Sequence, residues 1–170
     1  MSLNLSKALK TTVEKLTERF PESILNVYQS SGDTFIHIDA DSLIEISEFL
    51  KDELNYVVLS GLFGVDRYTS EERFEVVYNL ISLRDRQRLF VKVRCEEEEP
   101  ELETVTSIWR SASWKEREVY DMFGIVFLNH PDLRRIYMPE DFEYFPLRKE
   151  FPLLGIPGSI ELPSTTPDTD

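Results

Sequence analysis

The spacing of prolines in the last third of the chain constrains its fold more than any other feature. Beyond Gly124, prolines stand at positions 131, 139, 146, 152, 157, 163 and 167. Proline lacks a backbone N–H and clashes with the preceding helical turn, so no long helix fits between these positions. The segment also lacks an alternating pattern long enough for a sheet. The sequence therefore predicts a folded domain over residues 1–124, followed by an extended proline-rich tail over residues 125–170.

Composition narrows the class of protein. A length of 170 residues suits one domain with a real core plus a tail. The formal net charge of −13 argues against nucleic-acid binding and against direct attraction to anionic membranes. The single cysteine, Cys95, excludes an internal disulfide and a cysteine-rich metal or iron–sulfur set. No apolar leader and no run of about 20 apolar residues is present, so membrane association is expected only through partner proteins.

Hydrophobic periodicity predicts alternating helices and strands before the tail. An amphipathic helix is expected over residues 5–20, and Ser42 with Glu45 forms a capping-box pattern that begins a second helix ending near Leu54. Strands rich in apolar and β-branched residues are expected over 24–29, 34–38, 56–65, 74–83 and 88–95. This order predicts an α+β fold, a two-layer domain of helices on a mainly antiparallel sheet.

Three local features in this domain have simple structural interpretations. Gly61 and Gly64 lack the third glycine and the lysine of a phosphate loop, so they indicate a bulge or a close backbone approach. His37 lies in an alternating strand, where we expect it to face the surface. The acidic stretch Glu96–Glu103 repels itself and is expected to be a solvated loop that ends the strand system.

A third helix is predicted after this loop. Ser113 and Glu116 form a second capping-box pattern, and Gly124 is expected to close the helix. Val119, Met122 and Phe123 share one face of this helix. Lys115, Glu116 and Arg117 are expected to point elsewhere, and Glu118 and Asp121 stand one turn apart.

Glu118 and Asp121 also suggest catalysis. Two neighbouring carboxylates can divide acid and base roles, and His130 would complete a two-carboxylate, one-imidazole metal set. However, Arg117, Arg134 and Arg135 offer charge partners, so a structural ion-pair network is the favoured interpretation. His130 precedes Pro131 and is expected to be a hydrogen-bonded anchor at the first bend of the tail.

The tail has the composition of a protein-binding segment. Leaving its rings free in water would expose a large apolar surface, so the tail is expected to lie on another protein. Pro146, Leu147, Arg148 and Lys149 place two cations between apolar residues, which suits contacts with carboxylates of a partner. The aromatic residues of the tail are Tyr137, Phe142, Tyr144, Phe145 and Phe151.

Three phrases in this part of the chain carry a resemblance to one family. They are E-R-E-V-Y-D-M-F-G-I from Glu116, H-P-D-L-R-R-I from His130, and P-L-R-K-E-F-P from Pro146. Together they resemble the C subunit of the proton-translocating NADH:quinone oxidoreductase, the 30 kDa subunit family of respiratory complex I. That family commonly has Asp where Glu150 stands. The resemblance implies that the matching residues of this chain dock onto partner subunits and brace the chain itself. These residues are Glu116, Arg117, Glu118, Asp121, His130, Pro131, Arg134, Arg135, Pro146, Leu147, Arg148 and Lys149.

The resemblance implies a core scaffold protein that holds no cofactor or metal and contributes no catalytic residue. FMN and the iron–sulfur clusters would belong to partner subunits. The expected partners are chiefly the D subunit, with the B and I subunits that carry iron–sulfur clusters, at the cytoplasmic face of the inner membrane. Two alternatives stay open: the equivalent subunit of a ferredoxin-dependent complex or a membrane-bound hydrogenase, and an independent acidic enzyme that uses Glu118 and Asp121.

Overall fold

Runs of strands are separated by helices in the computed structural model, which describes residues 5–68, 71–152 and 155. The predicted α+β class is confirmed. Predictions for the tail beyond residue 155, including prolines 157 and 163, lie outside the described residues. The elements are α1 (Lys7–Arg19), β1 (Ile24–Ser30), β2 (Asp33–Ile38), η1 (Ala40–Ser42), α2 (Leu43–Asp52), β3 (Val58–Asp66), β4 (Phe74–Ser82), β5 (Gln87–Cys95), β6 (Glu101–Glu103), α3 (Ala112–Phe123) and β7 (Val126–Leu128).

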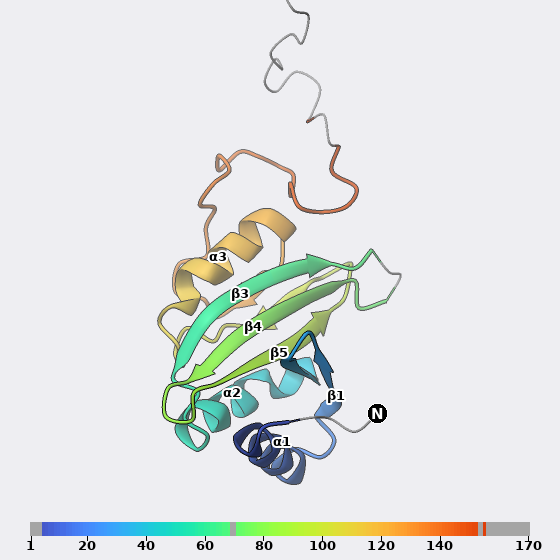
Figure 1. Ribbon diagram of the computed structural model, residues 1–170. Coiled ribbons are helices and arrows are strands. Elements are labelled where there is room, and N and C mark those ends of the chain that lie inside the picture. The colour runs from blue at the N-terminus through green and yellow to red at the C-terminus, as the bar shows by residue number, and fades with distance from the viewer. Residues whose placement is uncertain (1–4, 69–70, 153–154, 156–170) are drawn as a thin grey trace, which may run out of the picture.

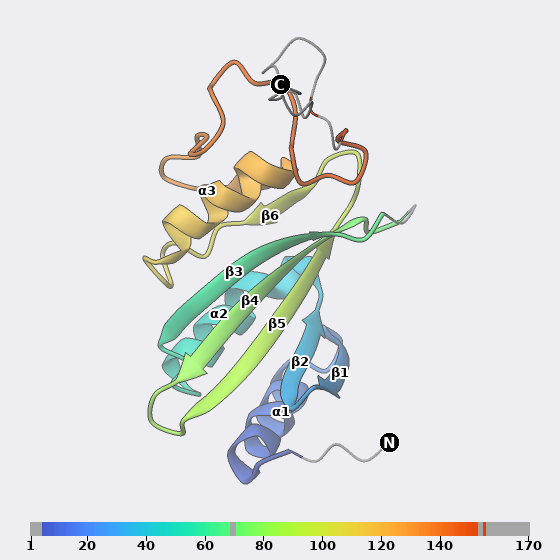
Figure 2. The ribbon, with the colours of Figure 1, turned by 45° about the horizontal axis from the view of Figure 1, so that its top comes forward.

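Five strands form one sheet in the order β1-β2-β5-β4-β3. Neighbouring strands are antiparallel except β2 and β5, which run parallel. A parallel pair needs a long crossover, and α2, β3 and β4 lie in the chain between these two strands. Figure 1 shows α1 and α2 together on one side of the sheet, and α3 beside β3. Figure 2 gives the same arrangement from a second direction.

The core lies between the sheet and the helices. Leu16 of α1, and Ile46 and Leu50 of α2, are almost completely buried. On β5, Leu89, Val91, Val93 and Cys95 face the core, and the residues between them are more exposed. Each fully buried aliphatic side chain of this kind stabilises the fold by about 1.5–3 kcal/mol.

Both predicted capping boxes were wrong. Ser42 stands at the N-cap of α2, but its hydroxyl donates a hydrogen bond to the hydroxyl of Ser23 at 2.7 Å and makes no cap bond. Helix α3 begins at Ala112, so Ser113 lies inside it, and the N-cap residue Ser111 makes no side-chain cap bond either. Gly124 closes α3 with φ 76°, as predicted.

The structure contains both features that the Gly61 and Gly64 pattern predicted, a bulge and a close backbone approach. The register of β3 against β4 shifts between Leu59 and Gly61, which is a bulge or an equivalent irregularity. A Cβ atom at Gly64 would stand 2.5 Å from the ring of Phe123, so this glycine allows α3 to approach β3 closely. The bulge and the close approach are therefore both confirmed.

Two further expectations about the strands were wrong. Glu101–Glu103 is not loop but strand β6, which pairs in parallel with β7, a strand that lies within the predicted tail. His37 is only 8% exposed and does not face solvent. Among the described residues, no helix has both the length and the apolar character needed to cross a lipid bilayer.

Candidate interaction site on α3 and the C-terminal segment

Helix α3 carries the first predicted site residues, and most of them point into the protein. Glu116 and Asp121 have no exposed surface and Arg117 is 6% exposed, whereas Glu118 lies in solvent. The expectation that Glu116 and Arg117 point away from buried surroundings was wrong. Buried charges are costly unless they are paired. Their partners come from the connection before α3 and from residues 129–152, called here the C-terminal segment.

Glu116 joins α3 to the chain that follows β6. Its carboxylate accepts hydrogen bonds from the backbone N–H of Val105 at 2.9 Å and from the hydroxyl of Thr104. Burial raises the pKa of Glu116 to about 6, although these two hydrogen bonds act in the opposite direction. Glu116 therefore fixes the start of α3 from within the protein.

His130 attaches the first bend of the C-terminal segment to α3. Its Nε2–H donates to the carbonyl oxygen of Ser113 at 3.1 Å, and its Nδ1 accepts from the backbone N–H of Asp132 at 3.0 Å. These two roles require the neutral ring with its proton on Nε2. The contacts agree with the expected anchoring role. The neighbouring Pro131, at the bend itself, is exposed.

Arg117 holds the backbone of the next residues. Its Nε and Nη2 atoms donate to the carbonyl oxygens of Arg134 and Arg135 at 3.0 and 3.1 Å. Its guanidinium carbon also lies 5.0 Å from the centre of the Trp114 ring, a cation–π contact. The exposed side chain of Arg134 pairs with Asp132 at 3.0 Å. The arginines therefore act mainly within the chain.

The carboxylate of Asp121 binds the turn that follows, at residues 136–138. Its carboxylate accepts from Nη1 of Arg135 at 2.8 Å and from the backbone N–H groups of Ile136, Tyr137 and Met138 at 2.6–3.0 Å. Burial alone would raise the pKa of Asp121, but these hydrogen bonds lower it below its ordinary value. The ionised carboxylate is thus fully engaged in holding the segment.

The geometry does not assemble the carboxylate pair suggested by the sequence. Glu118 lies in solvent, while Asp121 is buried and already accepts four hydrogen bonds. Both ring nitrogens of His130 are used by the backbone. Within the described residues, no group of three or more His, Cys, Asp or Glu side chains could hold a metal ion.

Arg148 fastens the far end of the C-terminal segment to α3. Its Nε donates to the carbonyl oxygen of Phe123 at 2.6 Å, and its guanidinium lies over the rings of Phe74 and Phe145. The neighbouring backbone N–H of Leu147 donates to the carbonyl oxygen of Met122 at 3.1 Å. The expectation that Arg148 reaches partner carboxylates differs from this geometry, in which Arg148 braces its own chain.

A buried ion pair secures the residues just beyond. Asp66 and Arg73 are joined by two hydrogen bonds of 2.9 and 2.7 Å, and Asp66 also accepts from the backbone N–H of Lys149. The bond from Arg73 lowers the pKa of Asp66 to about 2. Glu150 contacts Arg73 as well. Asp66 and Arg73 were not among the predicted site residues, although their opposite charges on either side of the β3–β4 turn are visible in the sequence.

Three large hydrophobic side chains of the C-terminal segment are exposed, among exposed charged residues. Tyr137, Tyr144 and Leu147 are 61%, 47% and 53% exposed. Beside them, a groove of about 470 Å³ is lined by residues that include Phe145, Arg148 and Phe151. Pro146 lines a neighbouring groove, and the exposed ammonium of Lys149 forms no ion pair with any described residue. Exposed apolar clusters of this kind often mark protein-binding surfaces.

Comparison with known proteins identifies the family. Residues 36–156 match the family described as Respiratory-chain NADH dehydrogenase, 30 Kd subunit. The chain belongs to this family. The residues of this chain that match the 30 Kd subunit family include α3 and all of the C-terminal segment. The resemblance found in the sequence is therefore confirmed.

Relatives in the 30 Kd subunit family cover most of the chain. The C subunit of NADH-quinone oxidoreductase from Geotalea uraniireducens (strain Rf4) is 43% identical over 143 residues, which is 84% of this chain and 87% of the relative. The C subunit from Roseiflexus sp. (strain RS-1) is 43% identical over 145 residues, with 84% and 83% covered. The C 2 subunit from Rhizobium etli (strain CIAT 652) is 42% identical over 161 residues, with 90% and 86% covered.

Solved structures agree with the fold of this family member. The trypsin-resistant fragment (1–134) of Nqo5 is 36% identical, with a TM-score of 0.65, and the match covers 74% of this chain and 99% of the fragment. A chain of an archaeal membrane-bound sulfane sulfur reductase is 24% identical with a TM-score of 0.74, covering 87% and 88%. The second likeness is one of fold alone.

Proposed function

We propose that this chain is a non-catalytic scaffold protein in the peripheral arm of an NADH:quinone oxidoreductase. There it supports electron transfer from NADH to quinone that is coupled to proton translocation. One observation carries the proposal. The charged side chains of Arg117, Asp121 and Arg148 form hydrogen bonds that hold the chain's own C-terminal segment on α3. The rings on the outer side of that segment stay exposed, ready to contact another protein.

The proposed role is geometric. Electron transfer between redox centres depends on fixed distances, and a rigid brace keeps the subunits that carry these centres in register. FMN and the iron–sulfur clusters are assigned to partner subunits. The names of the relatives favour NADH as electron donor over ferredoxin or hydrogen.

The C-terminal segment is assigned chiefly to the D subunit of the complex, with further contacts to the B and I subunits that carry iron–sulfur clusters. The complex would hold the chain at the cytoplasmic face of the inner membrane. The apolar surface around Tyr144 and Leu147 is the proposed contact. Lys149 adds an exposed cation that could meet a partner carboxylate.

The decisive experiment is to purify the tagged chain from detergent-solubilised membranes and identify the proteins that accompany it. The double variant Tyr144→Ser and Leu147→Ser removes exposed apolar surface and breaks no described side-chain hydrogen bond, although the Tyr144 ring also packs against the rings of Phe142 and Phe151. We expect it to lower recovery of the D subunit at least about tenfold, since central apolar contacts dominate interface energies.

Leu83→Ser is the matched control. Leu83 is 64% exposed at the β4–β5 turn, far along the chain from the C-terminal segment. It should leave recovery of the D subunit unchanged. The proposal fails if the wild-type chain is recovered alone, or if the double variant retains the D subunit as well as the Leu83 variant does.

A further inference from the structure

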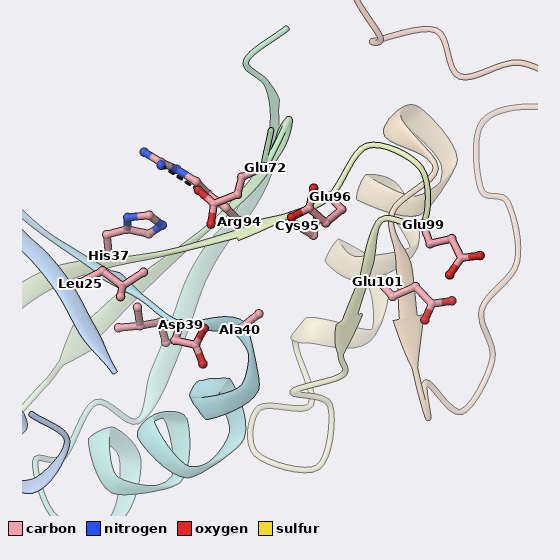
Figure 3. A pocket seen from close by; sticks show the side chains of 11 residues that line it. Leu25, His37, Asp39, Ala40, Glu72, Arg94, Cys95, Glu96, Glu99 and Glu101 are labelled. Carbon is pink, nitrogen blue, oxygen red and sulfur yellow. Dashed lines mark hydrogen bonds and ion pairs between the residues drawn. The ribbon is translucent and has the colours of Figure 1, made fainter. Parts of the chain in front are cut away.

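A second surface of the protein, distinct from the C-terminal segment, has the features of a binding site. A groove of about 250 Å³ lies between the end of β2 and the glutamate-rich chain around the start of β6. Five carboxylates line it, together with one cation, Arg94. Figure 3 shows these side chains around the groove. The carboxylates are Asp39, Glu72, Glu96, Glu99 and Glu101.

Most of this negative charge is unbalanced. Arg94 pairs with Glu72 at 3.2 Å and with Glu75, outside the groove lining, at 3.4 Å. The other four carboxylates form no ion pair with any residue that the structure describes. Like charges held close together repel one another, and a cation placed among them would relieve that repulsion.

A buried polar atom at the groove points to the same conclusion independently. His37 lines the groove and is only 8% exposed, and its Nε2 has no hydrogen-bond partner among the described residues. Figure 3 shows the imidazole at one end of the groove, on the same side as Leu25. Burial, followed by the nearby charge of Arg94, lowers the pKa of His37, which favours the neutral ring. A buried nitrogen without a partner is unusual in a folded protein.

The acidic side of the groove is held in place by backbone pairing. The backbone N–H of Val126 donates to the carbonyl oxygen of Pro100 at 2.8 Å, and Glu101 pairs in register with Val126. Leu102 is buried, so its neighbour Glu101 is directed outward. Glu101 therefore stands on strand β6, and Glu99 lies two residues before it, next to the Pro100 carbonyl that Val126 holds.

The remaining lining suits the stem of a long side chain. Leu25, 52% exposed, and Ala40 give the groove an apolar wall. Arginine and lysine lay their methylene chains on such surfaces and present the charged end to carboxylates. A liquid water occupies about 30 Å³, so the groove has room for such a side chain in place of several waters.

We propose that this groove binds a basic segment of a neighbouring protein in the complex, whose arginine or lysine side chain enters between His37 and the carboxylates of Glu99 and Glu101. The inference rests on the proposed function, because it requires the chain to work inside a larger complex. It adds a second, electrostatic contact to the apolar one on the C-terminal segment.

Carboxyl footprinting tests this directly. Carbodiimide-driven coupling of glycine ethyl ester labels accessible carboxylates, and the full chain is labelled both alone and within the purified complex. We expect labelling of Glu99 and Glu101 to fall at least about fivefold in the complex, because a bound cation covers them. Glu45 and Glu48, exposed on α2, are the internal reference. Equal labelling of the groove glutamates in both states overturns the inference.

A variant pair supplies the second measurement. Glu99→Gln with Glu101→Gln removes two groove charges, and Glu45→Gln with Glu48→Gln removes the same charge from α2. As salt rises, the groove variant should leave the complex earlier than the α2 variant, with at least about threefold less retained. Equal retention of the two variants in the complex overturns the proposed groove contact but leaves the proposed function intact. Failure of the wild-type chain to join any complex overturns both.

Discussion

The buried carboxylate of Asp121 accepts hydrogen bonds from the Arg135 guanidinium and from three consecutive backbone N–H groups. Asp121→Asn removes the charge and turns one acceptor into a donor facing those N–H groups. We expect the free energy of unfolding to fall by about 3 kcal/mol, the usual cost of breaking a buried pair. Urea unfolding followed by circular dichroism measures it. The matched change Glu118→Gln, on the exposed side of α3, should stay within about 0.5 kcal/mol.

Glu116 should make stability depend on pH. Its pKa is about 6 when folded and near 4.5 as an ordinary glutamate, so the folded state binds this proton more tightly. The contribution of Glu116 to stability is therefore present at low pH and is lost as pH rises through this window. Glu116→Gln cannot titrate, and its amide can still bond Thr104 and Val105.

The prediction for Glu116→Gln concerns the difference between variant and wild type. Measured by urea unfolding, the free energy of unfolding of the variant relative to wild type should rise by about 1.5 kcal/mol between pH 4.5 and pH 7. Groups remote from Glu116 titrate alike in both proteins and cancel, whereas His130, with Nε2 3.9 Å from the Glu116 carboxylate, contributes to the difference. A difference that stays flat across this range would show that the folded protein does not hold this proton more tightly.

At the scale of elements, β3 offers a matched pair of glycines. A Cβ atom at Gly64 would stand 2.5 Å from the buried ring of Phe123, which packs between β3 and α3. Gly64→Ala should therefore cost about 1–3 kcal/mol, the usual penalty for overpacking. At Gly61 the clash is with Phe63, whose ring is 51% exposed and free to turn away. Gly61→Ala should cost less than about 1 kcal/mol in thermal or urea unfolding.

Periodicity predicted the elements whose signal is local. Leu89, Val91 and Val93 alternate along β5, and the first helix stops before Pro21, so nearby residues alone define both. Strand β6 gave no such signal because it has three residues, two of them glutamate, and exists only by pairing with β7. Short strands made by distant pairing cannot be predicted from a local pattern.

The same distinction applies to the candidate site. The motif around Glu116 and Asp121 could be recognised in the sequence, but the direction of these side chains could not. Their partners, such as Val105 and Met138, lie elsewhere along the chain and are brought near only by the fold. The sequence likewise suggested that Arg148 contacts a partner protein. Its contact with Phe123 could not be predicted, because it depends on the return of the C-terminal segment to α3.

At the scale of the whole molecule, the C-terminal segment returns to α3 and to the end of β3, and Arg148 is one of the residues that attach it there. Arg148→Gln removes the bond to Phe123 and the contacts with the Phe74 and Phe145 rings. The backbone N–H groups of residues 147–151 should then open more often.

Hydrogen exchange read by mass spectrometry measures this opening. Exchange in residues 147–151 should speed up at least about tenfold in Arg148→Gln, because a loss of about 1.4 kcal/mol or more in local stability corresponds to a factor of 10. Lys149→Gln is the matched control, since its exposed ammonium forms no ion pair with any described residue and exchange should not change. If both variants exchange alike, the internal brace does not hold the segment, and its order would have to come from the partner protein instead.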